Sequence, residues 1–158
     1  MQRQNLFADD PWDVENADSR SRMFRRPDDA KLGATLYELD PGYDGDKFHM
    51  HFGVEEMFFV LSGRVVVRIL EGEEVLGAGD FLFCPEGRAG LHAFRNPHDE
   101  PARVLAMSTK RFPDVVAYPE EGYAWVATRV PELPPPPDDP GLIARFEFNP
   151  VQPDQRVE

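Results

Sequence analysis

Residues 49–56 read His49-Met-His51-Phe-Gly-Val-Glu-Glu56 and bring three metal-ligand side chains into eight positions. A second stretch, Gly79-Asp-Phe-Leu-Phe-Cys-Pro-Glu-Gly87, is followed by His92. The chain has only four histidines, so three of them in two short segments indicate one site. Alternate side chains of a strand share a face, and His49 and His51 can therefore chelate a single ion. The pattern predicts a small β-barrel that holds a divalent metal.

The chemistry of these side chains narrows the choice of metal. Three neutral imidazoles and one carboxylate suit Fe, Mn, Ni, Co, Cu or Zn better than Mg or Ca. The alternative is that each histidine is an ordinary surface or core residue with a satisfied hydrogen bond, and a His-X-His pair alone does not decide between the two. Glu56 and His92 favour the metal, because Gly and Pro residues set the turns that precede both. Four protein ligands would leave up to two open positions on a six-coordinate ion, which is typical of a catalytic site.

The chain around these segments is organised as many short strands. Each predicted strand is rich in β-branched or aromatic residues and is bounded by Gly, Pro, Asp or Asn. The predicted strands are Leu32–Leu39, Phe48–Phe52, Glu56–Leu61, Val65–Leu70, Phe81–Cys84, Leu91–Arg95 and Arg103–Ser108. No long stretch has helical periodicity. The spacing predicts an all-β sandwich or barrel.

Composition excludes several classes of function. A length of 158 residues fits one domain, and a net charge of -12 disfavours both nucleic acid and anionic membrane as partners. Cys84 is the single cysteine and cannot form an intrachain disulfide; we expect it to be a buried, inert thiol. The first residues contain no apolar signal-peptide core, and no apolar run approaches the length of a membrane span. We therefore expect a cytoplasmic protein.

The two flanks differ from the barrel segment. Residues 1–31 are polar and poorly periodic, and we expect an irregular arm that lies on the barrel or on a partner subunit and is compatible with a short helix. Asp114–Tyr118 is compatible with a helical turn, and Tyr123–Val130 resembles another strand. Pro131–Pro137 predicts an extended polyproline connector in a Pro-rich C-terminal tail, and Leu142–Phe148 a final edge strand. The predicted organisation is an arm at 1–31, a barrel core at 32–119 and a C-terminal extension at 120–158.

These motifs resemble those of a small single-domain bacterial cupin of the cupin-2 type. The family's first motif, G(X)5HXH(X)3–4E(X)6G, corresponds to Gly42, His49, His51, Glu56 and Gly63, although six residues separate Gly42 from His49. The second, G(X)5PXG(X)2H(X)3N, corresponds to Gly79, Pro85, Gly87, His92 and Asn96, although four residues separate Gly87 from His92. The longer form is similar to that of a group of uncharacterised bacterial cupins. The resemblance covers roughly residues 32–119.

The resemblance implies a double-stranded β-helix, also called a jelly-roll barrel, with a metal bound by His49, His51, Glu56 and His92. It leaves the reaction open, because cupins include dioxygenases, decarboxylases, sugar isomerases, storage proteins and ligand-binding regulators. We expect a small oxygen-rich substrate and a reaction like that of a sugar or sugar-phosphate isomerase or of a dioxygenase. The alternatives are a non-catalytic, metal-dependent small-ligand-binding module and a structural barrel. Analogy with small cupins also implies a homodimer.

Strand parity suggests which other side chains line the pocket. Lys47 shares a face with His49, Phe58 with Glu56, and Phe94 and Asn96 share the face of His92. Lys47 could neutralise a substrate carboxylate, or it could sit in a loop and reach solvent. Asn96 could touch substrate, or it could satisfy the backbone of a turn. No second carboxylate or histidine is placed as a general base, and we expect the remaining histidine, His98, to be exposed.

Overall fold

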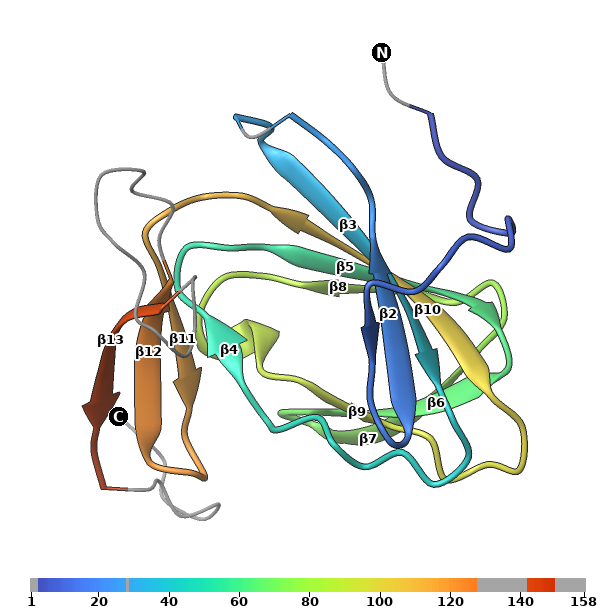
Figure 1. Cartoon of the computed structure of the whole chain (residues 1–158). Coiled ribbons are helices and arrows are strands. Elements are labelled where there is room, and N and C mark those ends of the chain that lie inside the picture. Colours follow the sequence, from blue (N-terminus) through green and yellow to red (C-terminus); the bar gives the residue numbers. More distant parts are fainter. Residues whose placement is uncertain (1–2, 28, 128–141, 150–158) are drawn as a thin grey trace.

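The structure is a computed structural model, and it describes residues 3–27, 29–127 and 142–149. The described residues form thirteen β-strands and one 3-10 turn (Figure 1). The elements are β1 (Val14–Glu15), β2 (Ser19–Met23), β3 (Leu32–Leu39), β4 (Met50–His51), β5 (Glu56–Ser62), β6 (Arg64–Ile69), β7 (Gly72–Gly77), β8 (Phe81–Cys84), η1 (Arg88–Gly90), β9 (Ala93–Arg95), β10 (Ala102–Thr109), β11 (Asp114–Tyr118), β12 (Tyr123–Ala127) and β13 (Leu142–Glu147). The prediction of an all-β jelly-roll barrel is confirmed. No helix in the described residues is long and apolar enough to cross a membrane.

Two walls of antiparallel strands enclose the barrel. One wall is a six-stranded sheet in the order β1-β2-β3-β10-β5-β8. The facing wall combines the sheet β7-β6-β9 with the sheet β13-β12-β11-β4. A bridge between His49 and His92 connects these two smaller sheets. Figure 1 shows β3, β5, β8 and β10 on one side of the barrel and β6, β7 and β9 on the other.

The core follows from the alternation of side chains along the strands. On β5, Phe58 and Val60 are buried, whereas Met57 and Phe59 on the opposite face are only half-buried. The same pattern on β6, β9 and β10 produces one apolar cluster. Its buried members are Leu39, Phe58, Val60, Val65, Val67, Leu76, Cys84, Phe94, Ala102 and Val104. Cys84 is 4% exposed, which confirms the prediction of a buried thiol.

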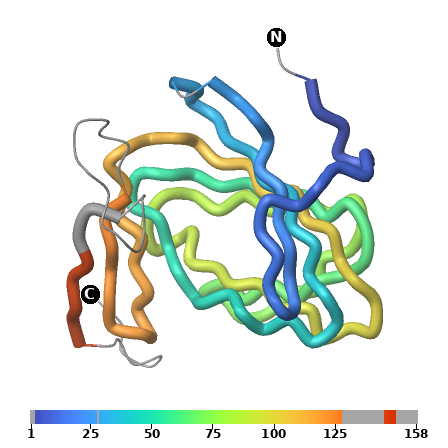
Figure 2. The backbone as a smooth tube through the Cα atoms, in the orientation of Figure 1, coloured from blue at the N-terminus to red at the C-terminus, as the bar shows by residue number. Residues whose placement is uncertain are grey.

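The N-terminal arm is irregular over most of its length, but it adds the strands β1 and β2 to the six-stranded sheet. β2 pairs with β3 along its whole length, and the described residues of the arm contain no helix. The buried Arg22 donates hydrogen bonds to the carbonyl oxygens of Leu6, Ala8 and Asp10. Its guanidinium therefore satisfies three backbone acceptors of the preceding segment and ties that segment to β2. Figure 2 shows the backbone of this segment leading into β1 and β2.

One helical-turn prediction was wrong, one strand was missed, and several bounds shift. Asp114–Tyr118 is strand β11, not a helical turn, because it pairs with β4 on one side and β12 on the other. β7 was missed, because its Gly-Glu-Glu-Val start is polar and faces solvent. The β4 and β9 strands are shorter than predicted, whereas the bounds of β3 and β8 agree. Residues 128–130 of the predicted Tyr123–Val130 strand and the polyproline segment lie outside the described residues.

Candidate metal centre

His49 and His92 come from distant parts of the chain and lie opposite each other. Their backbones exchange two hydrogen bonds, from the His49 amide to the His92 carbonyl and back, each with an N···O distance of 3.0 Å. Side chains of such an antiparallel pair project to the same face of the sheet. The two imidazole rings have their centroids 4.4 Å apart. The bridge therefore places His92, from the second motif, beside His49, from the first motif.

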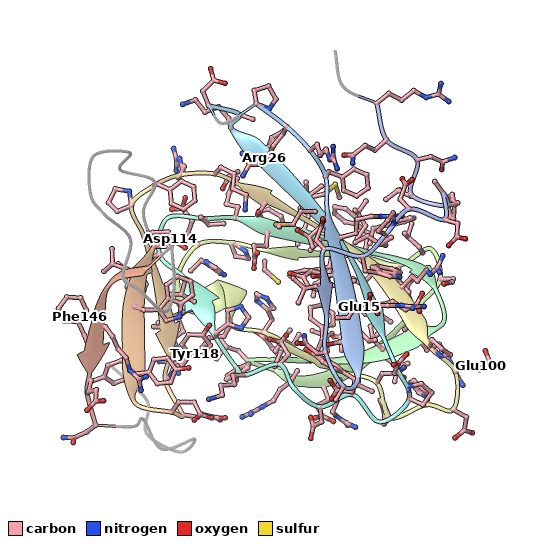
Figure 3. The ribbon with its side chains drawn as sticks, in the orientation of Figure 1. Glu15, Arg26, Glu100, Asp114, Tyr118 and Phe146 are labelled. Carbon is pink, nitrogen blue, oxygen red and sulfur yellow. The ribbon has the colours of Figure 1, made fainter. Side chains whose placement is uncertain are left out.

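His51 is fixed from both sides of β4. Its carbonyl accepts a hydrogen bond of 2.7 Å from the Gly87 amide, and β4 pairs with β11 on its other edge. The imidazole Nδ1 lies 2.6 Å from Oδ2 of Asp114, whose other oxygen accepts the Gly53 amide at 2.9 Å. Asp114 starts β11 and is 3% exposed, and Tyr118 ends the same strand (Figure 3).

Glu56 reaches the histidines from the opposite wall. It begins β5, and its Oε2 lies 3.3 Å from Nε2 of His51 and 3.4 Å from Nε2 of His92. His49, His51 and Glu56 each offer a ligand atom, and these atoms all lie within 4.8 Å of one another. The fold therefore brings the four predicted ligands together.

Hydrogen bonds orient all three imidazoles in the same way. Nδ1 of His49 lies 2.7 Å from the Lys47 carbonyl oxygen, and Nδ1 of His92 lies 2.8 Å from the Gly90 carbonyl oxygen. With Nδ1 of His51 held by Asp114, each neutral ring would carry its proton on Nδ1 and keep the Nε2 lone pair for an ion. Partners of this kind are the usual support of metal-ligating histidines. The donor set thus fits a divalent transition metal.

The extra residues between Gly87 and His92 have a structural role. They form the turn η1, and its last residue, Gly90, supplies the carbonyl that His92 contacts. A Cβ atom on Gly90 would lie 1.8 Å from the Pro85 carbonyl oxygen, so no side chain fits there. Gly87 has a φ of 75°, a conformation that favours glycine. The Pro-Glu-Gly-X-X-Gly pattern is therefore needed to position His92.

Burial and nearby charges shift the pKa values of His92 and His51 in opposite directions. Burial, followed by the nearby His49 and His51, lowers the pKa of His92 to about 3, so this ring is neutral at physiological pH. Burial also opposes protonation of His51, but the Asp114 hydrogen bond and the Glu56 charge outweigh it and raise the pKa of His51. Burial and then Glu56 raise the pKa of Cys84 to about 12, consistent with an inert thiol.

A cavity of about 220 Å³ opens beside these ligands. The sequence-predicted Phe58 and Phe94 line it, and Phe58 lies 4.9 Å from the His92 ring between centroids. Strand parity did not identify four further polar side chains of the lining. They are Tyr37, Tyr43, Asp46 and Tyr118. Tyr118 stacks on His49 at 5.5 Å between centroids, and alternation from Asp114 along a correctly assigned β11 would have found it.

Lys47 and Asn96 do not line the cavity. Lys47 is exposed, and its Nζ lies 3.5 Å from Glu121 and 5.6 Å from the Tyr123 ring centre. The fully buried Asn96 donates to the carbonyl oxygens of Leu39 and Glu100, so it satisfies turn backbone. Loop geometry before β4 and after β9 breaks the strand parity on which both pocket assignments rested.

The prediction that His98 is exposed was wrong. Its side chain is half-buried, and its Nε2 is buried without a hydrogen-bond partner among the described residues. The amide of His98 donates to Oδ1 of Asn96 at 3.1 Å, which draws the loop inward. His98 does not line the cavity.

Comparison with known proteins agrees with this architecture. Residues 35–108 match the family model described as the cupin domain, so the barrel is a small cupin domain of the cupin-2 type. A search of curated proteins found no match.

Solved structures with similar folds include two related to sugar phosphate isomerases. A proposed sugar phosphate isomerase from Acidithiobacillus ferrooxidans is 27% identical, with a TM-score of 0.58; the alignment covers 61% of this chain and 62% of that one. A sugar phosphate isomerase of the cupin superfamily from Silicibacter pomeroyi is 28% identical, with a TM-score of 0.58 and coverage of 71% and 76%. The polyketide cyclase RemF from Streptomyces resistomycificus shares the fold at 21% identity, with a TM-score of 0.57 and coverage of 72% and 84%.

Proposed function

We propose that this cupin is a metal-dependent enzyme that isomerises a small polyhydroxylated carbonyl compound. One observation carries the proposal: three imidazoles and the Glu56 carboxylate converge beside a cavity of about 220 Å³. Four protein ligands leave open positions on a six-coordinate ion, and the adjacent cavity gives a substrate room to reach them. The ion would be Fe, Mn, Ni, Co, Cu or Zn.

The metal ligands and the cavity residues would have different roles in such a reaction. A divalent ion held by the four ligands would act as a Lewis acid toward a substrate carbonyl or hydroxyl oxygen. Tyr37, Tyr43 and Tyr118 offer phenol groups that can donate to or accept from substrate hydroxyls. The Asp46 carboxyl lines the same space and is our candidate to carry a proton between neighbouring substrate carbons.

The two similar structures named as sugar phosphate isomerases support isomerisation over dioxygen chemistry. This chain spans 62% of the first and 76% of the second. An iron-dependent dioxygenase would use the same ligands and remains the second enzymatic candidate. Incubation with sugars in heavy water, after reconstitution with each metal, tests isomerisation: deuterium should enter the carbon beside the carbonyl. Oxygen uptake without deuterium entry would instead support the dioxygenase.

A non-catalytic binding module is the second class of function. One observation favours it: Asp46 accepts the Phe94 amide at 3.0 Å, so its carboxylate is already engaged by the fold. Such a module would hold its ligand through the same metal without converting it. A ligand that raises the melting temperature only in the presence of metal, and is recovered unchanged after long incubation, would support this alternative.

We also propose that two copies associate through β8, the last described strand of the six-stranded sheet. Phe81 and Phe83 lie on the outer face of β8, where they are 53% and 49% exposed. Leu82, between them in the chain, points to the opposite face. Antiparallel pairing of two β8 strands about Leu82 would place each Phe81 opposite the other copy's Phe83, a favourable aromatic pair. β8 contains no charge, whereas the chain as a whole is strongly acidic and would repel a second copy elsewhere. Light scattering after size exclusion should show a dimer that Phe83→Glu makes monomeric.

A further inference from the structure

We propose that the cavity selects an uncharged, oxygen-rich small molecule and discriminates against phosphate esters. The inference rests on the proposed function and narrows its substrate class. It starts from the side chains that surround the cavity rather than from the metal ligands. The described lining residues are Tyr37, Leu39, Tyr43, Asp46, His49, Glu56, Phe58, His92, Phe94, Val104, Ala106 and Tyr118. No lysine or arginine is among them.

Basic side chains that neighbour the lining in the chain or on a paired strand are engaged outside the cavity. Lys47 pairs with Glu121, and the Arg68 guanidinium forms two hydrogen bonds with Glu120, at 2.8 and 2.5 Å. Arg95 alternates with the inward-facing Phe94 and pairs with Glu73 at 2.7 Å. Each of these cations already has a carboxylate partner on the surface. Among the described lining residues, a phosphate in the cavity would therefore meet none of the paired N–H donors that usually bind it.

The charges inside the cavity point the same way. Glu56 offsets one charge of a divalent ion, and Asp46 adds a second carboxyl group at the lining. Glu56 and Asp46 already place two carboxyl groups at this site, and a phosphate dianion would add two more negative charges. An uncharged polyol brings no such charge, and its hydroxyls find hydrogen-bond partners in Tyr37, Tyr43 and Tyr118. The preference for an uncharged ligand would therefore come from repulsion of the phosphate ester as well as from hydrogen bonds to the neutral sugar.

The size of the cavity sets a limit on the ligand. A volume of about 220 Å³ corresponds to roughly seven water molecules at about 30 Å³ each. Phe58, Phe94 and Val104 close its inner end with apolar surface. A sugar of three to six carbons in its unphosphorylated form suits this space and polarity, and a phosphate group would have to be placed against carboxylate and apolar walls.

Matched pairs of sugars test the inference with binding rather than turnover. The protein loaded with Mn²⁺ is titrated with glyceraldehyde, xylulose and fructose and with their phosphate esters, and water-proton relaxation reports displacement of metal-bound water. We expect at least one neutral sugar to bind and its ester to bind at least about tenfold more weakly. Equal or tighter binding of the ester would overturn the inference and leave the proposed function standing. Absence of metal-dependent binding by either class would overturn both.

A variant pair checks the electrostatic part of the inference. Asp46→Asn removes the lining carboxylate at constant shape. It should reduce the ratio of the ester's dissociation constant to that of the neutral sugar by about threefold or more. Asp44→Asn removes an exposed carboxylate two positions away and should leave the preference unchanged. Equal effects of the two substitutions would show that net charge, not the lining, sets the preference, and would contradict the inference. Circular dichroism spectra of both variants check that each is folded.

Discussion

His49 and His92 are 43 positions apart in the chain, yet their backbones form a closed pair of 3.0 Å hydrogen bonds that sets their imidazoles side by side. The pair is also the bridge between the two sheets of one barrel wall. The geometry of the candidate metal site and the closure of the barrel therefore depend on the same contact. Changes that disturb the turn before His92 should affect both stability and metal affinity.

Gly90→Ala should damage the site through the η1 turn. The new Cβ atom would meet the Pro85 carbonyl oxygen, and relief of this clash must move the Gly90 carbonyl that holds His92. We expect a loss of about 1–3 kcal/mol in the free energy of unfolding, typical of overpacking, together with weaker metal binding. Urea denaturation and metal titration measure the two effects. Gly77→Ala is the control, because its Cβ would lie 3.8 Å from the closest side-chain atom; an equal loss there would refute the specific role of Gly90.

Asp114→Asn should weaken metal binding without loss of a direct ligand. The carboxylate orients His51 through Nδ1, and loss of such a partner typically costs 10–100-fold in affinity. Competition with a chelating dye gives the dissociation constant. Asp99→Asn, in an exposed loop, provides the matched control. Unchanged affinity in Asp114→Asn would show that His51 is not a ligand or that its orientation is set elsewhere.

The stability of the metal-free protein should fall between pH 6.5 and 5. The pKa of His92 is about 3 in the folded state and about 6.5 in the unfolded state, so the unfolded chain binds the extra proton. Each pH unit in this window should cost about 1.4 kcal/mol. His51 has the opposite sign: its raised pKa adds stability as the pH falls toward 6.5, and this contribution is constant below that value. Urea titrations of chelator-treated protein measure the slope.

The variant His92→Gln should flatten this slope, and His98→Gln should not. A slope that persists unchanged in His92→Gln would mean that carboxylates dominate the window and that burial of His92 contributes little. The comparison uses metal-free protein throughout, because bound metal would itself add a pH-dependent stability.

Glu38 should matter for attachment of the arm. This carboxylate is 5% exposed and pairs with Arg20 of β2 and Arg103 of β10. Because both arginines are more than one third exposed, we expect Glu38→Ala to cost only about 1–2 kcal/mol, measured by urea denaturation. Cleavage by trypsin at Arg20 should also become faster. The surface substitution Glu73→Ala is the control, and an equal response to both would contradict the anchoring role.

The clustering of the four candidate ligands could be predicted because each stands in a short, punctuated motif. His49 and His51 follow from strand alternation, and the glycines and proline before Glu56 and His92 mark turns whose geometry the structure displays. Long-range pairing could not be read in the same way. The assignment of Asp114–Tyr118 as a helical turn hid both the partner of His51 and the ring that stacks on His49.

The remaining pocket residues escaped prediction because loops interrupt strand parity. Asp46 lines the cavity while Lys47 faces solvent, since the chain between β3 and β4 has no regular strand. Tyr37 lies on a strand whose bounds were predicted, but no local pattern showed which face of β3 met the cavity. Both faces of β3 carry buried side chains, Leu36 on one and Leu39 on the other, so the choice depends on tertiary contacts.

Metal content tests the central claim most directly. Protein purified without chelator is analysed by inductively coupled plasma mass spectrometry, alongside Glu56→Gln, His92→Gln and His98→Gln. We predict about one equivalent of a single first-row transition metal in the wild type and in His98→Gln, and a large loss in the other two variants. A wild type that binds no first-row metal even after reconstitution, or equal metal in all four proteins, would contradict the assignment of His49, His51, Glu56 and His92 as one metal site.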